Sequence, residues 1–450
     1  MLNYIWLGLV LASVMIGTWN GAMPEVTAAA FDRAKTAVVT LAIPLAGIMA
    51  LWLGMMRLAE RSGLIQVIAR GLRPIMVRLF PDVPPEHPAM GSMLMNMAAN
   101  MLGLSNAATP LGLRAMKHLE ALNKTPGTAT NSMCTFLAIN TSSIQLIPAT
   151  AVGILSAAGS KDPTAIIGTA FLATLCAATA AIAMVKLLEK LNVFRAPAEA
   201  AVGEAKPDAD AAVEEKPPAL LPLTLVGKTA LIAFFLLFGV ALLQIAFPEL
   251  GSCSGGGFAT AQACPITGCL KGVAVPLIKG ISILAIPFFL SFFPLYASLR
   301  GVKVYEEFVE GAKEGFQVAL RIIPYLVAIL VAIGMFNAAG GIALLTKWLS
   351  PVLNLVHFPT QLLPLALMRP LSGSGSLGLF SDIVETHGAD NILSRMAGTL
   401  YGSTETTFYV LAVYFGAVGI RRTRHAIPAG LTADIVGIIA SVIICRIVFS

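Results

Sequence analysis

The stretch NMAANMLGLSNAATP, from Asn96 to Pro110, lies within an apolar run but is interrupted in its middle by Asn, Gly and Ser residues. A second interrupted stretch, MRPLSGSGSLG, runs from Met368 to Gly378. Polar breaks at membrane depth are tolerated only where they line a cavity or lie inside protein. We therefore expect residues 89–113 and 360–383 to form two re-entrant helical hairpins, each entering and leaving the membrane on one side.

The composition around these stretches is that of a membrane protein. Of the 450 residues, 57% are hydrophobic and only 12% are charged, and the mean hydropathy is +0.81. Soluble domains carry about 25% charged residues. Apolar runs of roughly 20 residues can cross a bilayer as helices. We expect an all-α polytopic membrane protein, surrounded by the lipid bilayer, with about nine spanning helices at residues 2–22, 36–56, 132–157, 163–188, 222–246, 273–298, 316–337, 398–419 and 427–449.

A polar segment divides the chain into two parts. Residues 196–218 are rich in Ala, Pro and Glu and offer no apolar face to bury. Such a composition cannot form a packed core, so we expect a disordered cytoplasmic linker. The predicted halves are residues 1–195 and residues 219–450, the second with an extra leading helix.

The two halves carry the same series of motifs in the same order. An odd number of predicted crossings separates the two copies, so the second copy is inserted upside down. Inverted-topology repeats of this kind place a substrate site near the membrane midplane, where broken helices of both repeats meet. The matched segments are Phe31–Lys35 with Phe308–Lys313, Ile43-Pro44 with Ile323-Pro324, Leu111–Leu113 with Leu377–Leu379, and Asn140–Ser143 with Ser403–Thr407.

The basic residues predict the orientation. Lys and Arg gather on the cytoplasmic side of membrane proteins. With a cytoplasmic N-terminus, both dense Arg clusters, in residues 57–78 and 421–424, fall inside. We expect a bacterial inner-membrane protein with a cytoplasmic N-terminus and a periplasmic C-terminus. No basic stripe lies on a soluble domain, so we expect no nucleic-acid partner.

Three cysteines lie in the Gly-rich loop 249–271, which this topology places in the periplasm. That compartment permits disulfides. Two of Cys253, Cys264 and Cys269 could pair, and the sequence leaves open which two.

Glu405 is the most informative polar residue, because it lies within a predicted apolar helix. A charged side chain at mid-membrane is costly and is usually paired, solvated or protonated. Glu405 could carry a proton, bind a coupling cation or hydrogen-bond the substrate; the structural alternative is a bond to Arg369. Arg369 could instead bind a carboxylate or phosphate of the substrate.

Further polar residues cluster at the breaks and at the two polar knots of the matched helices. Freed N–H groups at half-helix ends suit anionic groups, although Ser and Thr also bond back to their own helix or hold helices together. The predicted substrate-binding residues are Asn100, Ser105, Asn106, Thr109, Asn140, Thr141, Ser142, Arg369, Ser372, Ser374, Ser376, Ser403, Thr404, Glu405 and Thr406.

We expect neither a cofactor nor a metal site. The segment Gly373 to Gly378 fits the dinucleotide pattern G-x-G-x-x-G, but that pattern needs a preceding strand, and here it lies in a membrane hairpin. The five His residues are scattered along the chain. No catalytic constellation is visible, so we expect the protein not to be an enzyme.

Long motifs in each half resemble known families. Residues 81–91, 100–112 and 135–142 resemble spore maturation protein A. Residues 369–376, 401–409 and 414–416 resemble spore maturation protein B. The chain thus looks like a fusion of the two. The resemblance implies membership of the nucleoside-recognition (Gate) group, with concentrative nucleoside transporters and the membrane part of ferrous iron transporter B.

Three functions are consistent with these features. The first is a secondary transporter of a small polar solute, nucleoside-like or another metabolite, coupled to protons or cations. The second is a passive channel or permease subunit. The third is an envelope-assembly protein of the spore-maturation type. Small-residue helix faces, such as Ala177 to Ala183, would also allow a homo-oligomer.

Overall fold

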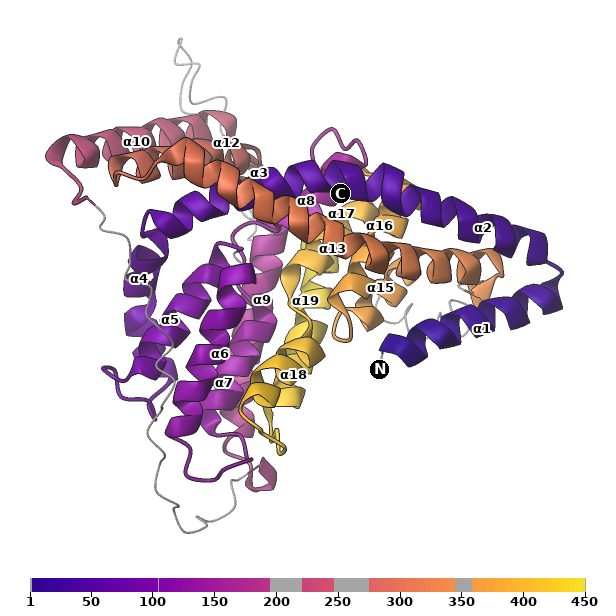
Figure 1. The fold of residues 1–450 in the computed structure, drawn as a ribbon, viewed down its shortest axis with the longest axis horizontal. Coiled ribbons are helices and arrows are strands. Elements are labelled where there is room, and N and C mark those ends of the chain that lie inside the picture. The colour runs from indigo at the N-terminus through magenta and orange to yellow at the C-terminus, as the bar shows by residue number, and fades with distance from the viewer. Residues whose placement is uncertain are drawn as a thin grey trace, which may run out of the picture.

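The computed structural model describes residues 2–103, 105–194, 221–246, 275–341, 343–344 and 358–449. Within these ranges the chain forms helices joined by turns, and the one extended pairing is an isolated bridge between Thr128 and Arg422 (Figure 1). The predicted all-α fold is confirmed. The predicted linker at 196–218 and the cysteines Cys253, Cys264 and Cys269 lie outside the described residues.

The first half begins with one helix and continues into a long rod. The rod is made of three consecutive helical segments. A helical hairpin, a pair of short helices and a closing helix follow. The elements are α1 (Leu2–Asn20), α2 (Met23–Lys35), η1 (Thr36–Ala42), α3 (Ile43–Arg61), α4 (Leu64–Leu79), α5 (Pro88–Met101), α6 (Ser105–Ala121), α7 (Asn131–Ser142), α8 (Ala149–Ala157), α9 (Ile166–Leu188) and η2 (Asn192–Phe194).

The second half repeats this order after one extra helix, α10. Its long helix, α13, corresponds to the rod α2–η1–α3, and its hairpin and paired short helices follow in the same sequence. The elements are α10 (Leu225–Ala246), α12 (Val275–Leu299), α13 (Val304–Ala338), η5 (Thr360–Leu362), α15 (Leu363–Met368), α16 (Gly373–His387), α17 (Ile392–Ser403), α18 (Thr407–Ala417) and α19 (Ala426–Phe449).

Helix α13 lies against α2 and α3 and joins the two halves. It crosses the molecule from the α10–α12 pair at one end to the α1–α2 pair at the other (Figure 1). Glycines allow the close approach: a Cβ on Gly315 would lie 2.5 Å from the Met49 carbonyl oxygen. Farther along α13, a Cβ on Gly334 would meet Arg33. Residue numbers rise in α13 as they fall in its partner, so the two helices are antiparallel, as inverted repeats require.

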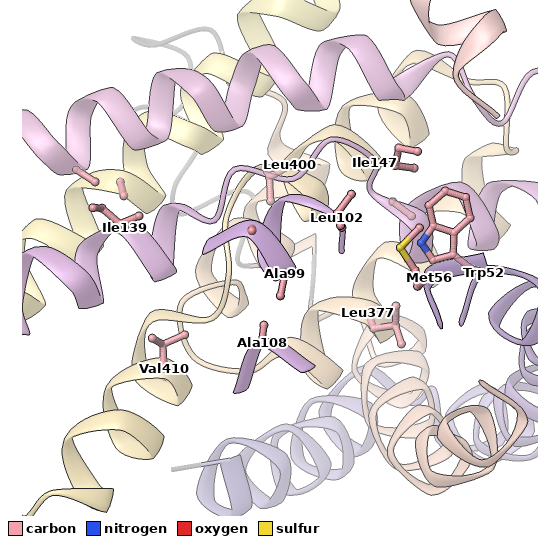
Figure 2. Packing of buried hydrophobic residues seen from close by; sticks show 14 of the residues in the cluster. Trp52, Met56, Ala99, Leu102, Ala108, Ile139, Ile147, Leu377, Leu400 and Val410 are labelled. Atoms are coloured by element: carbon pink, nitrogen blue, oxygen red, sulfur yellow. The ribbon is translucent and has the colours of Figure 1, made fainter. Parts of the chain in front are cut away.

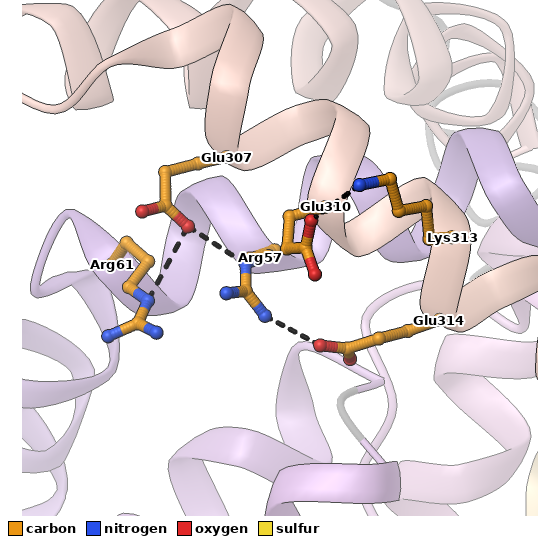
Figure 3. A network of polar contacts seen from close by, with 6 residues as sticks. All are labelled: Arg57, Arg61, Glu307, Glu310, Lys313 and Glu314. Carbon is orange, nitrogen blue, oxygen red and sulfur yellow. Dashed lines mark hydrogen bonds and ion pairs between the residues drawn. The ribbon is translucent and has the colours of Figure 1, made fainter.

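Ion pairs lie at both ends of the rod α2–η1–α3. On α3, Arg57 binds Glu307 at 2.8 Å and Glu314 at 2.6 Å, both on α13 (Figure 3). At the other end, Arg33 on α2 binds Glu385 on α16 at 2.7 Å. These side chains are partly exposed, so each pair contributes at most about 1 kcal/mol. The pairs therefore add little to the close packing of the helices.

Several helices are suited to a bilayer. Among the described residues, five helices are long and apolar enough to cross a membrane, and shorter apolar helices lie at Trp6–Asn20 and Leu326–Ala338. Together these match the predicted spans except 132–157 and 398–419. The protein is a multi-pass, all-α membrane protein. The five long helices are Met23–Arg61, Ile166–Leu188, Leu225–Ala246, Val275–Leu299 and Ala426–Phe449.

The two remaining predicted spans, 132–157 and 398–419, are wrong as continuous helices. The first breaks after Ser142 into α7 and α8, and the second breaks after Ser403 into α17 and α18. Ser143 adopts a positive φ of 25°, and Pro148 disfavours helical backbone just before it. In the second break, hydroxyl side chains compete for the backbone hydrogen bonds.

The broken helices are embedded in a core that both halves share. Trp52 of α3, Leu102 after α5 and Ile147 before α8 belong to the same buried cluster as Leu377 of α16 and Leu400 of α17 (Figure 2). All five side chains are buried. The apolar core thus surrounds the point where hairpins and broken helices of both halves converge.

Candidate functional site

The two helix breaks are bonded directly to each other. The backbone N–H of Glu405 donates to the Thr141 carbonyl at 2.7 Å. Each break is also bonded to the hairpin of its own half: Leu146 donates to Met101 at 3.0 Å, and Phe408 donates to Pro370 at 3.1 Å. The four interrupted elements therefore meet at one place, with equivalent bonds in the two halves.

Side chains satisfy the carbonyls that the breaks release. The buried Thr174 hydroxyl on α9 donates to the carbonyls of Ser142 at 2.8 Å and Ser143 at 2.9 Å. In the second break, the Arg369 guanidinium donates to the Thr404 carbonyl. Unpaired backbone groups in an apolar interior would cost several kcal/mol each. These bonds allow the chain to unwind there.

A cavity of about 150 Å³ lies at this junction. Its walls come from the tip of the first hairpin, from both helix breaks and from the second hairpin. Both halves are needed to form it. The lining residues are Gly103, Gln145, Ile147, Pro148, Ala149, Thr150, Ala151, Arg369, Tyr401, Gly402 and Glu405.

Arg369 lines the cavity and is 3% exposed. Besides the Thr404 carbonyl, its guanidinium contacts the Thr406 hydroxyl at 3.3 Å and lies 4.7 Å from the centroid of the Tyr401 ring. Its buried Nε has no hydrogen-bond partner among the described residues. No ion pair joins Arg369 to Glu405 within the described ranges. The alternative hypothesis, a direct bond between Arg369 and Glu405, is therefore wrong for this structure.

Glu405 lies in the break and not within a helix, contrary to the sequence prediction. Its side chain is half-buried and lines the cavity. The Gln145 amide donates to its Oε1 at 2.9 Å. Each half thus contributes one member of this bond. A half-buried carboxylate facing a small cavity can accept a proton or attract a cation.

Two of the predicted Asn residues, Asn100 and Asn140, form a separate cluster outside the cavity lining. Asn100 donates to the Asn140 side-chain oxygen at 2.8 Å, and Asn140 donates to the Phe136 carbonyl at 3.0 Å. The Tyr414 hydroxyl also lies 3.4 Å from the Asn140 oxygen. Thr109 is half-buried and takes part in an interaction of its own. The side chains of Ser105 and Asn106 lie outside the described residues.

Most of the predicted Ser residues bond to their own helix. Ser142 donates to Ile139, Ser403 donates to Leu400, and Ser376 donates to Ser372. Ser372 caps α16 by accepting from the Gly375 N–H at 3.0 Å and lies 3.3 Å from Ser374. These are hydrogen bonds within a helix or at its cap, which was the alternative to ligand binding expected for Ser and Thr side chains. By contrast, the buried hydroxyl of Thr141 has no partner among the described residues.

Two informative residues were missing from the predicted set. Tyr401 lines the cavity beneath Arg369. Asp434 on α19 is 1% exposed and accepts a hydrogen bond from the Thr407 hydroxyl at 2.5 Å. A carboxylate within an apolar span is the same signal that singled out Glu405. That signal was present in residues 427–449 and could have identified Asp434.

Groups of three or more His, Cys, Asp or Glu side chains that could hold a metal ion do not occur in the described part of the chain. The described cysteines Cys134, Cys176 and Cys445 are free thiols. The cavity instead presents one guanidinium, one carboxylate and the amides of a helix start, a set that suits a small polar organic solute or ion.

These features define a class: multi-pass α-helical membrane proteins in which broken helices from two repeats enclose a small polar cavity. A family model described as "Gate: Nucleoside recognition" matches residues 42–161 and 319–421. These ranges contain both hairpins and both helix breaks. The chain belongs to this family.

Two relatives from Bacillus subtilis (strain 168) each match part of the chain. Spore maturation protein B is 43% identical over 173 residues, which are 38% of this chain and 97% of that protein. Spore maturation protein A is 46% identical over 182 residues, which are 40% of this chain and 92% of that protein. The chain is therefore similar to nearly the whole of two separate proteins, as expected for a fusion.

Proposed function

We propose that this protein is a secondary transporter of a small polar solute, with the cavity between the two breaks as its substrate site. The observation that carries the proposal is that Arg369 and Glu405 both line this cavity without pairing with each other. Burying charged groups at membrane depth is costly, and such residues usually mark a substrate or ion pathway.

The repeat architecture supports a moving site. Inverted repeats with discontinuous helices operate by rocking one repeat against the other around a fixed site. Here the direct link between the breaks is the Glu405–Thr141 backbone bond, to which the Gln145–Glu405 side-chain bond is added. Both could break and re-form as the halves rotate, so the cavity could open to either side in turn.

Glu405 is the proposed coupling group. Protonation would weaken its bond from the Gln145 amide and change the charge of the cavity, so that solute binding and proton binding are linked. A cation attracted to the carboxylate would act in the same sense.

The family description "nucleoside recognition" does not by itself supply the substrate. A cavity of about 150 Å³ is smaller than the pockets of roughly 300 Å³ and above that hold drug-sized ligands. We therefore propose a solute smaller than a nucleoside. A passive channel, or an envelope role suggested by the relatives' names, is the alternative. We further propose the bacterial inner membrane as its location, with the N-terminus cytoplasmic.

Transport by purified protein in liposomes tests the proposal. Radiolabelled small metabolites are offered with and without a proton or Na⁺ gradient. We expect gradient-driven accumulation of at least one solute and its loss in Glu405→Gln. The matched control is Glu86→Gln, because Glu86 does not line the cavity and its side chain is 87% exposed. Flux that never exceeds equilibration, under any gradient, would favour a channel; no flux of any solute would reject transport.

A further inference from the structure

We propose that the cavity recognises a small zwitterion, an α-amino acid with a short side chain. This inference rests on the proposed function and names its substrate class. The cavity brings together a positive wall and a negative wall, each built from groups that the fold leaves incompletely paired.

The positive wall contains Arg369. Its Nη groups contact a carbonyl and a hydroxyl, which are neutral, and its Nε has no partner among the described residues. Asp434 lies near enough to act on it electrostatically, but Asp434 is bonded to Thr407 and does not line the cavity. A buried guanidinium without a carboxylate in contact is costly. A ligand carboxylate would supply that missing contact, which Arg binds in a two-pronged manner.

The start of α8 adds to the same wall. Residues Pro148 to Ala151 line the cavity and form the N-cap and first turn of this nine-residue helix. The N-cap is a proline and makes no side-chain cap hydrogen bond. The Ala149 N–H already donates to the Ile147 carbonyl at 2.9 Å. The N–H groups of Thr150 and Ala151 have no acceptor within their helix, and the helix dipole there favours negative charge. The start of α8 and Arg369 are thus suited to the same anionic group.

The negative wall is the Glu405 carboxylate, which Gln145 holds by one hydrogen bond. A carboxylate in a small cavity disfavours a ligand that carries only negative charge. It favours a ligand that also carries an ammonium group. Because one positive and one negative side chain line the cavity, a ligand with both charges is matched better than a simple anion or a simple cation.

The size of the cavity restricts the ligand further. A cavity of about 150 Å³ is smaller than the roughly 300 Å³ at which pockets for drug-sized ligands begin. It therefore favours a compact ligand, such as glycine or alanine, over an aromatic amino acid.

Binding of three matched compounds to the full-length protein in detergent tests the proposal by thermal shift and calorimetry. L-alanine carries both charges, propionate lacks the ammonium group, and ethylamine lacks the carboxylate. We expect L-alanine to bind at least about tenfold more tightly than either, since each lost charge-assisted bond is worth about 1.5–3 kcal/mol. Equal affinity for alanine and propionate would overturn the proposal.

Variants separate the two walls. Glu405→Gln should abolish the preference for alanine over propionate, while Glu86→Gln should leave it unchanged. Arg369→Lys keeps the charge but not the planar fork, so it should weaken alanine and propionate alike and leave ethylamine unaffected. An unchanged alanine preference in folded Glu405→Gln would reject Glu405 as the ammonium site and with it the proposal.

The same protein in liposomes distinguishes failure of this inference from failure of the proposed function. If another solute is accumulated while L-alanine is neither bound nor moved, the proposed zwitterion substrate is wrong and the proposed transport function stands. If L-alanine binds with the expected preference but no solute is moved under any gradient, transport is wrong and the zwitterion site stands. Accumulation of L-alanine that unlabelled propionate does not inhibit would support both.

Discussion

Glu405 donates its backbone N–H to the carbonyl of Thr141 across 2.7 Å, which ties the break of one half to the break of the other. The bond forms because the two breaks lie next to each other, so that a free N–H of one meets a free carbonyl at the end of α7. Its surroundings show which side chains keep these breaks in place, and these side chains give testable predictions.

Thr174→Val should destabilise the protein. The substitution preserves shape but leaves the carbonyls of Ser142 and Ser143 without their hydroxyl donor in a fully buried position. The expected loss is about 1–3 kcal/mol, measured as a lower thermal unfolding temperature in detergent. Thr179→Val on the same helix is the control, because Thr179 is exposed and bonds only to Leu175 of its own helix. Equal effects of the two substitutions would contradict a special role for Thr174.

Asp434 and Thr407 should behave as a coupled pair. Their bond of 2.5 Å is fully buried. Asp434→Leu therefore leaves the Thr407 hydroxyl without its acceptor, and Thr407→Val leaves the Asp434 carboxylate without its donor. Each should cost about 1–3 kcal/mol. The double variant should cost less than the sum of the two by about 0.5–3 kcal/mol, as residues in contact do. Additive losses would show that the two side chains do not interact.

Gly315→Ala should push α13 away from α3. The new Cβ would lie 2.5 Å from the Met49 carbonyl oxygen and 2.7 Å from the Ala50 Cα, both backbone atoms that cannot yield easily. We expect a loss of about 1–3 kcal/mol or more. Gly239→Ala is the control, since nothing lies within 4 Å of its Cβ and alanine favours a helix by about 1 kcal/mol. A neutral Gly315→Ala would contradict this close approach of α13 to α3.

His425 should make stability depend on pH. It is fully buried just before α19, and burial, with help from Arg424 and Lys186, lowers its pKa to about 4. The unfolded imidazole has a pKa of about 6.5, so the native state favours the neutral form. Its contribution is complete above pH 6.5 and is lost as the pH falls toward 4, by roughly 3 kcal/mol.

The measurement is the unfolding temperature of the wild type and of His425→Phe between pH 7.5 and 4.5. Both ring nitrogens of His425 have no hydrogen-bond partner among the described residues. An apolar ring should therefore flatten the pH slope even if it packs less well. A slope that is the same in both proteins would place the pH sensitivity elsewhere.

Much of this fold could be predicted from the sequence. Polar interruptions in apolar runs identified both hairpins, α5–α6 and α15–α16. The broken helices were missed because hydropathy over 132–157 and 398–419 is that of a helix. The unwinding depends on Thr174 and Arg369, which are far from the breaks in sequence and donate to them only in the folded protein.

The candidate site was predicted only in part. Arg369 and Glu405 were identified by charge in an apolar setting, and both line the cavity. The Asn100–Asn140 bond lies to one side, because sequence patterns indicate which residues are polar but not toward which neighbour each side chain turns. Gly103 and Ala149 also line the cavity, but neither carries a polar side-chain group by which the sequence could have identified it.

The cavity takes Gly103 and Gln145 from one half and Arg369 and Glu405 from the other, so neither half can form it alone. Joining the halves in one chain fixes their ratio at one to one, because both are made in the same round of translation. A version made as two polypeptides would have to match their expression and find the right partner in a crowded membrane.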